Sequence, residues 1–382
     1  MNQLNKIINH LKINPVKFVH VLGVDGIFSE SIIYYMQCNK ELFKPNDNLI
    51  VVNGYSEDSD KYDNVIYLKN LNKQIIFFLE NILEYTNHIV IHYLDFNLSL
   101  KISKNVCPKI IWRTWGNDLT YSISYVPGVK LKIKMLYKKL LWNLISKRNV
   151  RMFEAVGMSA TGCDKITLKK QRINVPTVSM PYPTNYWAED IMQIVKRPFD
   201  RLVKSDNEIW IMIGHSANSS LNHIKYLKKL AHLKNESIRI LMPMVYGRED
   251  YKNKVKKKAY DIFGNKAIVW TEKLKYDDYL RLLNLIDISI FDAKHQMAMG
   301  NISDLLLLGK LVVLNKKGIA YQTLQNNGIK IHDTSIIDNI SYKGMESIIS
   351  KNKPLIAKKY FYNLRTKEAI DKKWSYIYEI FK

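Results

Sequence analysis

The amino-acid sequence predicts an α/β protein with two doubly wound domains in tandem. Short apolar runs recur along the 382 residues, helical stretches separate many of them, and one proline-rich stretch interrupts the pattern. Strands that alternate with helices form right-handed βαβ units on a mostly parallel sheet. The length fits two or three domains at about 100–200 residues each.

The first domain is expected over residues 1–184. Its strands are predicted from runs rich in Val, Ile and aromatic residues, which favour extended structure. These runs are Lys17–Gly23, Leu49–Asn53, Val65–Leu68, Ile89–His92, Ile110–Trp115 and Glu154–Ser159. Apolar residues at helical spacing predict helices between several of them, for example over Lys73–Tyr85, Val129–Ser146 and Thr161–Lys169.

The second domain is expected over residues 185–353. Pro176, Pro181 and Pro183 block regular ladders and helices, so the domain junction is predicted there. Strand-like runs then resume at Glu208–Gly214, Ile238–Pro243, Ala267–Trp270, Asp287–Phe291 and Leu311–Asn315. Helices are predicted between them over Ser220–Leu233, Tyr251–Phe263, Tyr276–Leu285 and Ile302–Leu308. Residues 354–382 are predicted to form a helical tail that packs back on the first domain.

The composition is that of a packed and strongly basic protein. Hydrophobic residues make up 47% of the chain, which excludes a disordered protein. No apolar stretch reaches the length of a signal peptide or a membrane span, so we expect a protein that is soluble or lies on a surface. The three cysteines form no CxxC pair, which fits a reducing cytosol.

The net charge narrows the class of partner. With 58 Lys and Arg against 35 Asp and Glu, the chain carries +23, which attracts nucleic acid, anionic lipid or a phosphorylated substrate. The sequence contains no zinc finger, KH loop or RRM-like motif, so we expect no nucleic-acid partner.

Two loops of the second domain are predicted to bind a phosphorylated ligand, because open α/β sheets bind ligands at the carboxyl ends of their strands. Gly214–Asn218 reads GHSAN between a strand and a helix, so Gly214 and Ser216 let backbone N–H groups face a phosphate. Two alternatives are a nucleophile elbow centred on Ser216 and a plain glycine turn with a serine N-cap. The elbow is disfavoured because Asn218 stands where a small residue is needed.

The second of these loops, Phe291–Asn301, leads into a helix whose first N–H groups and positive dipole end lie near Gly300 and Asn301. Lys294, His295 and Gln296 supply polar side chains beside it. The alternative is a structural loop whose Met297 and Met299 fill the core.

In the first domain, Asp25 and Asp118 each follow a predicted strand, and both are candidates for the catalytic base. The alternative for either residue is an Asx-turn or a helix cap. His20 and His92 lie within predicted strands, where histidines are more often satisfied core residues than catalysts.

Two further motifs concern a metal ion and a membrane. Asp58 and Asp60 have the DxD spacing of a metal-dependent transferase, but they lie in a polar stretch typical of a solvated loop, so we expect no metal. Residues 129–151 carry eight Lys or Arg and no acidic residue, with Ile133, Leu136, Leu140 and Leu144 at helical spacing and Trp142 beside them. Such a helix can lie on an anionic membrane or pack its leucines inward.

Eight motifs together resemble the TDP-N-acetylfucosamine:lipid II N-acetylfucosaminyltransferases of enterobacterial common antigen synthesis. They occur in the family's order from residue 18 to about 315. The motifs are HVLGVD (20–25), WRTWGNDL (112–119), SATGCD (159–164), YPT (182–184), IGHSANSSLNH (213–223), PMVY (243–246), TEKLKYDDYLRLL (271–283) and HQMAMGN (295–301). Two runs depart from the family pattern, because HQMAMG replaces an RQQGIG-like run and GHSAN replaces a GNSGD-like run.

The resemblance implies a GT-B glycosyltransferase with two Rossmann-like domains, which moves a dideoxy amino sugar from a TDP donor to an undecaprenyl-diphosphate-linked oligosaccharide. It implies a peripheral protein at the cytoplasmic face of the inner membrane, without metal or other cofactor. The departures leave UDP- or GDP-sugars, an O-antigen acceptor and a non-catalytic phosphate-binding protein as alternatives. The implied donor-binding residues are Gly214, Ser216, Asn222, His223, Tyr246, Lys273, Lys294, His295, Gln296, Gly300 and Asn301. The implied acceptor-binding residues are His20, Gly23, His92 and Arg113, with Asp25 or Asp118 as the base.

Overall fold

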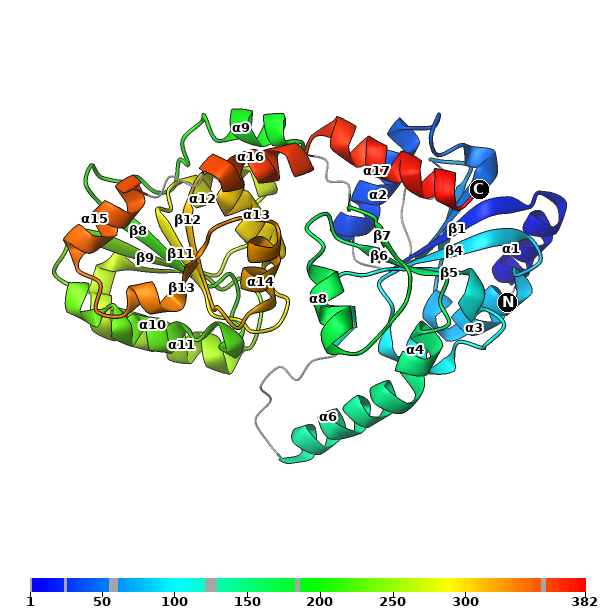
Figure 1. Cartoon of the computed structure of the whole chain (residues 1–382), viewed down its shortest axis with the longest axis horizontal. Helices are drawn as coiled ribbons and strands as arrows, with labels where there is room; N and C mark the ends of the chain where they lie inside the picture. Colours follow the sequence, from blue (N-terminus) through cyan, green and yellow to red (C-terminus); the bar gives the residue numbers. More distant parts are fainter. Residues whose placement is uncertain (1, 24–25, 55–60, 121–128, 183–185, 352–354) are drawn as a thin grey trace. The chain divides into compact units, whose positions relative to one another are not determined.

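The computed structural model describes residues 2–23, 26–54, 61–120, 129–182, 186–351 and 355–382 (Figure 1). Two compact units divide the chain. The first contains the described residues up to 182 together with Lys367–Lys382, and the second contains those of Tyr186–Thr366. Each unit is an α/β domain with one parallel sheet, which confirms the predicted fold class.

The first unit has a seven-stranded parallel sheet in the order β3-β2-β1-β4-β5-β6-β7. Strands β2 and β5 are buried along their whole length and β1 over its last five residues, as expected for runs such as NLIVVN and IIWR that are mostly apolar. The chain order reverses between β1 and β4, the point where doubly wound sheets bind ligands. The strands are β1 (Val16–Leu22), β2 (Asn48–Asn53), β3 (Val65–Leu68), β4 (Thr86–His92), β5 (Ile110–Arg113), β6 (Ala155–Met158) and β7 (Thr177–Ser179).

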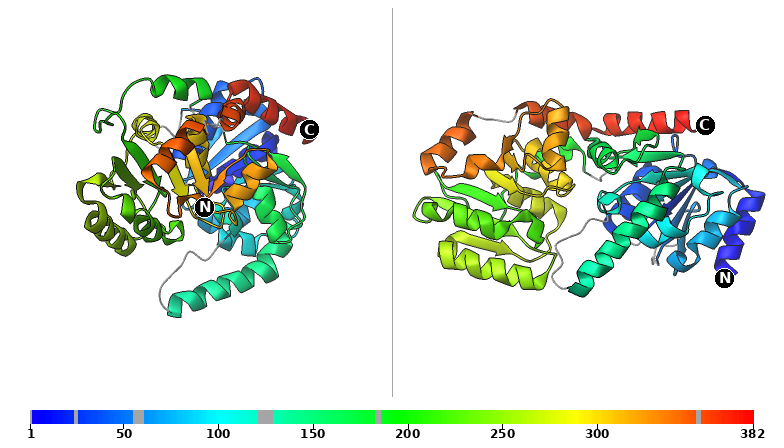
Figure 2. Two further views of the ribbon diagram at one scale, coloured as in Figure 1. Left: turned by 60° about the vertical axis from the view of Figure 1, so that its left-hand side comes forward. Right: turned by 60° about the horizontal axis from the view of Figure 1, so that its bottom comes forward.

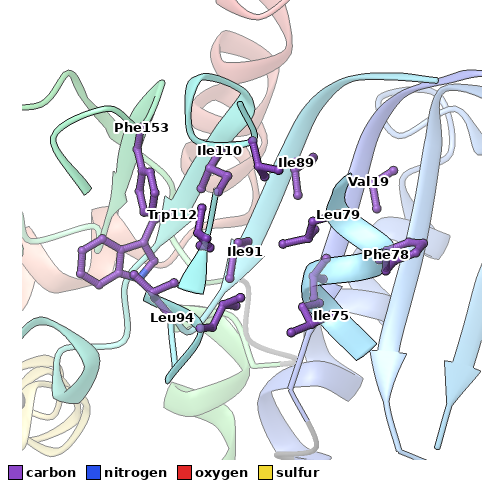
Figure 3. Close-up of a cluster of buried hydrophobic side chains, with 14 of the residues drawn as sticks. Val19, Ile75, Phe78, Leu79, Ile89, Ile91, Leu94, Ile110, Trp112 and Phe153 are labelled. Carbon is purple, nitrogen blue, oxygen red and sulfur yellow. The ribbon is translucent and has the colours of Figure 1, made fainter. Parts of the chain in front are cut away.

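Helices cover both faces of this sheet. One face carries the core in Figure 3, where Ile75, Phe78 and Leu79 of α3 pack on Val19 and Ile89. The other face is covered by α2 and by the C-terminal helix α17. The helices are α1 (Asn2–Ile13), α2 (Gly26–Cys38), α3 (Leu71–Asn81), α4 (Phe96–Lys101), α5 (Asn117–Thr120), α6 (Val129–Leu141), the π-helical turn η3 (Trp142–Ser146), α7 (Lys147–Val150), α8 (Cys163–Lys170) and α17 (Lys367–Ile380).

The second unit repeats this strand order in a six-stranded parallel sheet, β10-β9-β8-β11-β12-β13, so its order reverses between β8 and β11. The strands are β8 (Ile209–Ile213), β9 (Ile238–Pro243), β10 (Ala267–Trp270), β11 (Ile288–Phe291), β12 (Leu311–Leu314) and β13 (His332–Asp333). The helices are α9 (Ala188–Ile194), α10 (His223–Lys229), α11 (Glu249–Phe263), α12 (Tyr276–Asn284), α13 (Met299–Leu307), α14 (Ile319–Asn326), α15 (Tyr342–Lys351) and α16 (Leu355–Leu364).

Alternate residues of β8 are buried in two separate hydrophobic cores, one on each face of the second unit's sheet. Trp210 and Met212 pack with α9, α12, α13, α14 and α16 on one face. Ile211 and Ile213 pack with α10, α11 and α15 on the other. The turned view at the right of Figure 2 shows this sheet between its two helical layers. Helices therefore pack on both faces of the sheet, which fixes the ends of the strands and the positions where the following loops begin.

The tail after residue 354 is helical, and its two helices belong to different units. Ala357 and Phe361 of α16 are buried in the second unit. The indole of Trp374 in α17 donates a hydrogen bond to the Pro181 carbonyl in the first unit at 3.1 Å. The expected return of the tail to the first domain thus begins at Lys367 rather than at residue 354.

None of the described helices is both long and apolar enough to cross a membrane.

Candidate functional site

A sharp turn at Gly214 follows β8, the strand beside the switch point of the second sheet. Gly214 donates its N–H to the Ile290 carbonyl of β11 at 2.9 Å and has a φ of +66°. A Cβ at this position would lie 2.5 Å from Nε2 of His223. The backbone conformation and the close packing both require glycine, which explains this element of the GHSAN motif.

Ser216 lies just beyond this turn and is only 2% exposed. Its side chain hydrogen-bonds the phenol of Tyr246, whose ring is largely exposed at the same edge of the sheet. A buried hydroxyl engaged in this way is not presented as a nucleophile, so the geometry does not favour the elbow alternative.

Asp292, at the end of β11, holds the loops of this edge together, and it was not among the predicted site residues. Its Oδ2 accepts hydrogen bonds from Asn222 Nδ2 and from Lys225 Nζ, both at 2.9 Å. Its Oδ1 accepts one from Asn315 Nδ2 at 2.7 Å. The carboxylate is 3% exposed and thereby links the ends of three neighbouring elements. The sequence feature that could have indicated this role is an Asp directly after the apolar run Ile288–Phe291.

Two histidines of this edge are neutral because they are buried. Desolvation lowers the pKa of His215 to about 4, and desolvation followed by repulsion from His215 lowers that of His223 to about 3. His223 is fully buried under Gly214 and its Nδ1 lies 3.2 Å from the Tyr251 hydroxyl. The structure therefore places His223 in the packing of the loop, and a ligand would meet Gly214 first.

The loop before α13 carries the other predicted donor-binding residues. Ala298 takes a left-handed φ of +61° and α13 begins at the next residue. A Cβ added to Gly300 would find nothing within 4 Å, so this glycine faces open space. Gln296 is buried, His295 is half-buried with a pKa lowered by desolvation, and Lys294 is exposed. Lys273, after β10, is also exposed.

Hydrogen bonds and an ion pair connect α13 to α12 and to Arg365. The Tyr279 hydroxyl donates to Asn301 Oδ1, and the Tyr276 hydroxyl donates to Asp304 Oδ2 at 3.0 Å. Arg365 forms an ion pair with Asp304, which is only 5% exposed. The predicted residue Asn301 is therefore engaged with α12.

In the first unit, His20 and His92 form a buried pair. His20 Nδ1 lies 3.1 Å from His92 Nε2, and His20 Nε2 lies 3.3 Å from the Tyr378 hydroxyl of α17. Each histidine is 1% exposed. Desolvation, outweighing a hydrogen bond to the side chain of Asn48, lowers the pKa of His20 to about 4, and desolvation brings that of His92 well below its usual value. For His20, within the sheet, the geometry favours the core-histidine alternative.

Arg113 and Asp118 lie at the carboxyl end of β5. Asp118 is fully buried and accepts hydrogen bonds from Trp112 Nε1 at 2.8 Å, Trp115 N at 2.9 Å and Leu94 N at 3.2 Å. Desolvation raises its pKa to about 6 despite these bonds. A carboxylate with three internal donors and no exposed surface positions its loop, so the geometry favours the cap alternative for Asp118.

Four predicted residues and the expectation about a metal ion remain to be placed. Asp25, Asp58 and Asp60 fall outside the described residues. Gly23 is half-buried and its carbonyl accepts a hydrogen bond from Ser29 Oγ at 2.8 Å. Among the described side chains, no three His, Cys, Asp or Glu residues are grouped to hold a metal ion.

The sequence matches one protein family over most of its length. The family is described as 4-alpha-L-fucosyltransferase, glycosyl transferase group 56, and the match covers residues 17–357. The chain belongs to this family. The predicted glycosyltransferase activity is thereby confirmed, and the family's own description is of a fucosyltransferase.

Solved structures show that the fold of this group 56 glycosyltransferase is GT-B. A glycosyltransferase from Rickettsia africae is 17% identical, with a TM-score of 0.62 over 97% of this chain and 98% of that one. A trehalose-6-phosphate protein from E. coli bound with UDP-2-fluoro glucose is 10% identical, with a TM-score of 0.59 over 96% and 99%. Anabaena HepE in complex with UDP-glucose is 12% identical, with a TM-score of 0.58 over 95% and 99%.

Proposed function

We propose that this glycosyltransferase moves a dideoxy amino sugar such as N-acetylfucosamine from a TDP donor to an undecaprenyl-diphosphate-linked oligosaccharide. The family's description as a fucosyltransferase supports a fucose-type sugar. The structures of two neighbours with UDP-sugars support a nucleotide-sugar donor. The acceptor and the common-antigen or O-antigen product follow from the motif resemblance alone.

The observation that supports the donor site is the open backbone at Gly300, in the loop and first turn of α13 that follow β11. In this proposal the diphosphate lies against the first N–H groups of α13, where the helix dipole favours negative charge. Lys294 and Lys273 would neutralise the leaving diphosphate without a metal, while His295, whose pKa is lowered by desolvation, would donate a hydrogen bond from its neutral ring. Asn222 and Asn301, which are engaged with Asp292 and Tyr279, would hold the loops in place.

On the acceptor side we assign the proton-accepting role to Asp25. Asp118 is the less suitable of the two predicted bases because its carboxylate is buried under three donors. General-base catalysis contributes about 10²–10⁴-fold to turnover. We therefore expect Asp25→Asn to lose about that much turnover with unchanged donor affinity.

We further propose that α6 and the turn after it attach the protein to the cytoplasmic face of the inner membrane. Ile133, Leu136, Leu140 and Leu144 are each more than half exposed, which argues against leucines packed inward. Lys138, Lys139 and Arg148 are exposed on the same segment, which suits anionic lipid. Trp142 does not take part, because it is buried and donates to Gln171 Oε1 at 2.7 Å.

The deciding experiment compares TDP, UDP and GDP as ligands in thermal unfolding. A ligand that binds only the folded protein raises the melting temperature by mass action, and we expect the largest shift with TDP. Gly300→Val should reduce the TDP shift, which is measured against the variant's own melting temperature without ligand, and the variant should fold because a Cβ at this position meets no protein atom within 4 Å. A larger shift with UDP or GDP would reassign the nucleotide. If no nucleotide shifts melting at millimolar concentration, the donor-site proposal is wrong.

A further inference from the structure

Tyr93 adopts a backbone conformation that aromatic residues rarely take. It directly follows β4 and has a φ of +72°, while its N–H donates to the Arg113 carbonyl of β5 at 3.1 Å. This left-handed conformation is unfavourable for a residue with a Cβ, and glycine or asparagine adopts it more readily. Strained residues of this kind cluster at functional sites. The ring of Tyr93 is still 38% exposed, so burying it in the core does not account for the strain.

The Tyr93 ring is the first in a row of three aromatic rings. Its centroid lies 5.6 Å from that of Trp115, which in turn lies 5.5 Å from that of Tyr182 at an interplanar angle of 88°. Trp115 and Tyr182 are both half-buried. The residues come from the ends of β4 and β5 and from the segment after β7, so the row runs along the carboxyl edge of the first sheet.

Two buried polar groups lie behind this row with unused hydrogen-bonding capacity. His92 Nδ1 and Arg113 Nε are buried and find no hydrogen-bond partner among the residues that the structure describes. The His92 ring meets the Tyr182 ring edge-on at 5.9 Å, and the Arg113 guanidinium lies over the Tyr182 ring at 5.2 Å. His92 is 1% exposed and Arg113 is 4% exposed. Buried polar atoms without partners are uncommon and call for an explanation such as a ligand.

The local charge argues against an anion at this edge. The buried carboxylates of Asp118 and Asp164 both attract the single guanidinium of Arg113. Asp164 is held like Asp118, since its Oδ2 accepts the Ser159 N–H at 2.6 Å. A diphosphate would meet this pair of carboxylates, whereas a neutral ring with hydroxyl groups would not. Aromatic faces with a few fixed polar groups are typical of small-molecule sites.

We infer that Tyr93, Trp115 and Tyr182 form an aromatic platform for a neutral pyranose ring, in which the exposed Tyr93 ring stacks on the sugar and Trp115 and Tyr182 meet one another edge-on beside it. His92 and Arg113 are its hydrogen-bonding groups. The inference rests on the proposed function, in which this ring is the sugar of the acceptor. It assigns the first unit's site to the acceptor's carbohydrate and leaves the lipid diphosphate to other residues.

The test is binding of N-acetylglucosamine to the full chain, measured by saturation-transfer NMR. Sorbitol, a polyol that lacks a ring, is the control ligand. Tyr93→Gly removes the first ring and suits the left-handed backbone, so the fold should survive. Because the sugar loses its contact with the aromatic ring, we expect about a fivefold loss of N-acetylglucosamine affinity. Tyr93→Asn, which also tolerates this backbone, should lose as much. Asn207→Gly is the matched control, since Asn207 is exposed at a φ of +62° in the second unit.

Wild-type protein that shows no transfer to N-acetylglucosamine, or as much to sorbitol, overturns the platform. So does a Tyr93→Gly variant that binds as well as wild type. The melting shift with TDP is measured on the same samples and depends on the second unit. A protein that responds to TDP but not to the sugar therefore contradicts only this inference, and one that responds to no nucleotide contradicts the donor-site proposal.

Discussion

The carboxylate of Asp292 accepts a hydrogen bond from the side-chain amide of Asn222 at 2.9 Å, across 70 positions of the chain. This bond connects the end of β11 with the start of α10, on either side of the switch point of the second sheet. The two loops predicted to hold the donor are therefore mechanically coupled through one buried side chain.

Asp292→Asn should weaken both stability and donor binding. An asparagine offers one oxygen where Asp292 offers two, so at least one of its three donors loses its partner, at a cost of about 1–3 kcal/mol. We expect the affinity for TDP to fall about tenfold in titration calorimetry as the loops separate. Asp261→Asn, an exposed residue of α11, provides the control and should leave both quantities unchanged. Equal TDP affinity in both variants would show that the coupling has no part in binding.

Gly214→Ala should destabilise the protein more than Gly162→Ala. Both glycines have positive φ, +66° and +72°, so both substitutions carry the cost of a left-handed alanine, about 1–2 kcal/mol. Only at Gly214 would the new Cβ also meet His223, at 2.5 Å, whereas nothing lies within 4 Å at Gly162. The difference between the two free energies of unfolding, measured with urea, isolates the steric contribution. Identical losses would mean that His223 moves away freely.

Stability should decrease as the pH falls from about 6.5 to 4. The folded-state pKa values of His20, His215 and His223, at about 4, 4 and 3, lie below the usual 6.5. The unfolded chain therefore binds more protons in this window, and its free energy falls relative to the folded state. Each residue contributes about 3 kcal/mol of destabilisation by pH 4.

The pH effect has a direct check in His223→Gln. Denaturant unfolding at pH 5 and pH 7.5 should show a smaller loss for this variant than for the parent. His10→Gln, which removes an exposed histidine, should keep the parent's loss. A His223→Gln variant with the full pH dependence would contradict a buried neutral imidazole at this position.

The α6 segment should bind vesicles that contain anionic lipid and not neutral vesicles. Lys139→Glu together with Arg148→Glu should reduce sedimentation with anionic vesicles, because each basic residue near the surface contributes about 1 kcal/mol. Lys256→Glu with Lys257→Glu makes the same charge change on exposed positions of α11 and serves as the control. Leu136→Ser with Leu140→Ser tests insertion separately. High salt should abolish the attraction between charges, so sedimentation that persists at high salt should be lost in this variant. Equal sedimentation of all variants would assign the membrane contact, if present, to another surface.

Apolar patterning was sufficient to predict most of the sheets. A buried apolar run such as IWIMI in β8 is typical of a central strand of a parallel sheet, because it has no polar side chain on either face. Strand β7 was missed because its three residues lie between Pro176 and Pro181, where proline is tolerated only at a sheet edge. The helix α1 was not predicted, although its Leu4, Ile7, Ile8 and Leu11 have helical spacing and are buried.

The candidate site was predicted less completely, because it depends on contacts between residues far apart in sequence. The Gly214 turn followed from a local motif. The role of Asp292 did not, since it depends on Asn222, Lys225 and Asn315 arriving from other elements. Likewise, the position of Asp118 after a strand predicted either a base or a cap, and only its three internal donors favour the cap.

The first unit is discontinuous in sequence, because α17 closes one face of a sheet whose strands all precede residue 180. Phe18 of β1 packs on the Tyr378 ring with the ring centroids 4.4 Å apart, and His20 of β1 lies within hydrogen-bond distance of the Tyr378 hydroxyl. Domains usually fold in the order of their synthesis, the N-terminal one first. Here the ribosome completes the second unit at Thr366, before it releases the last helix of the first. On a nascent chain, the N-terminal unit is therefore the last to become fully native.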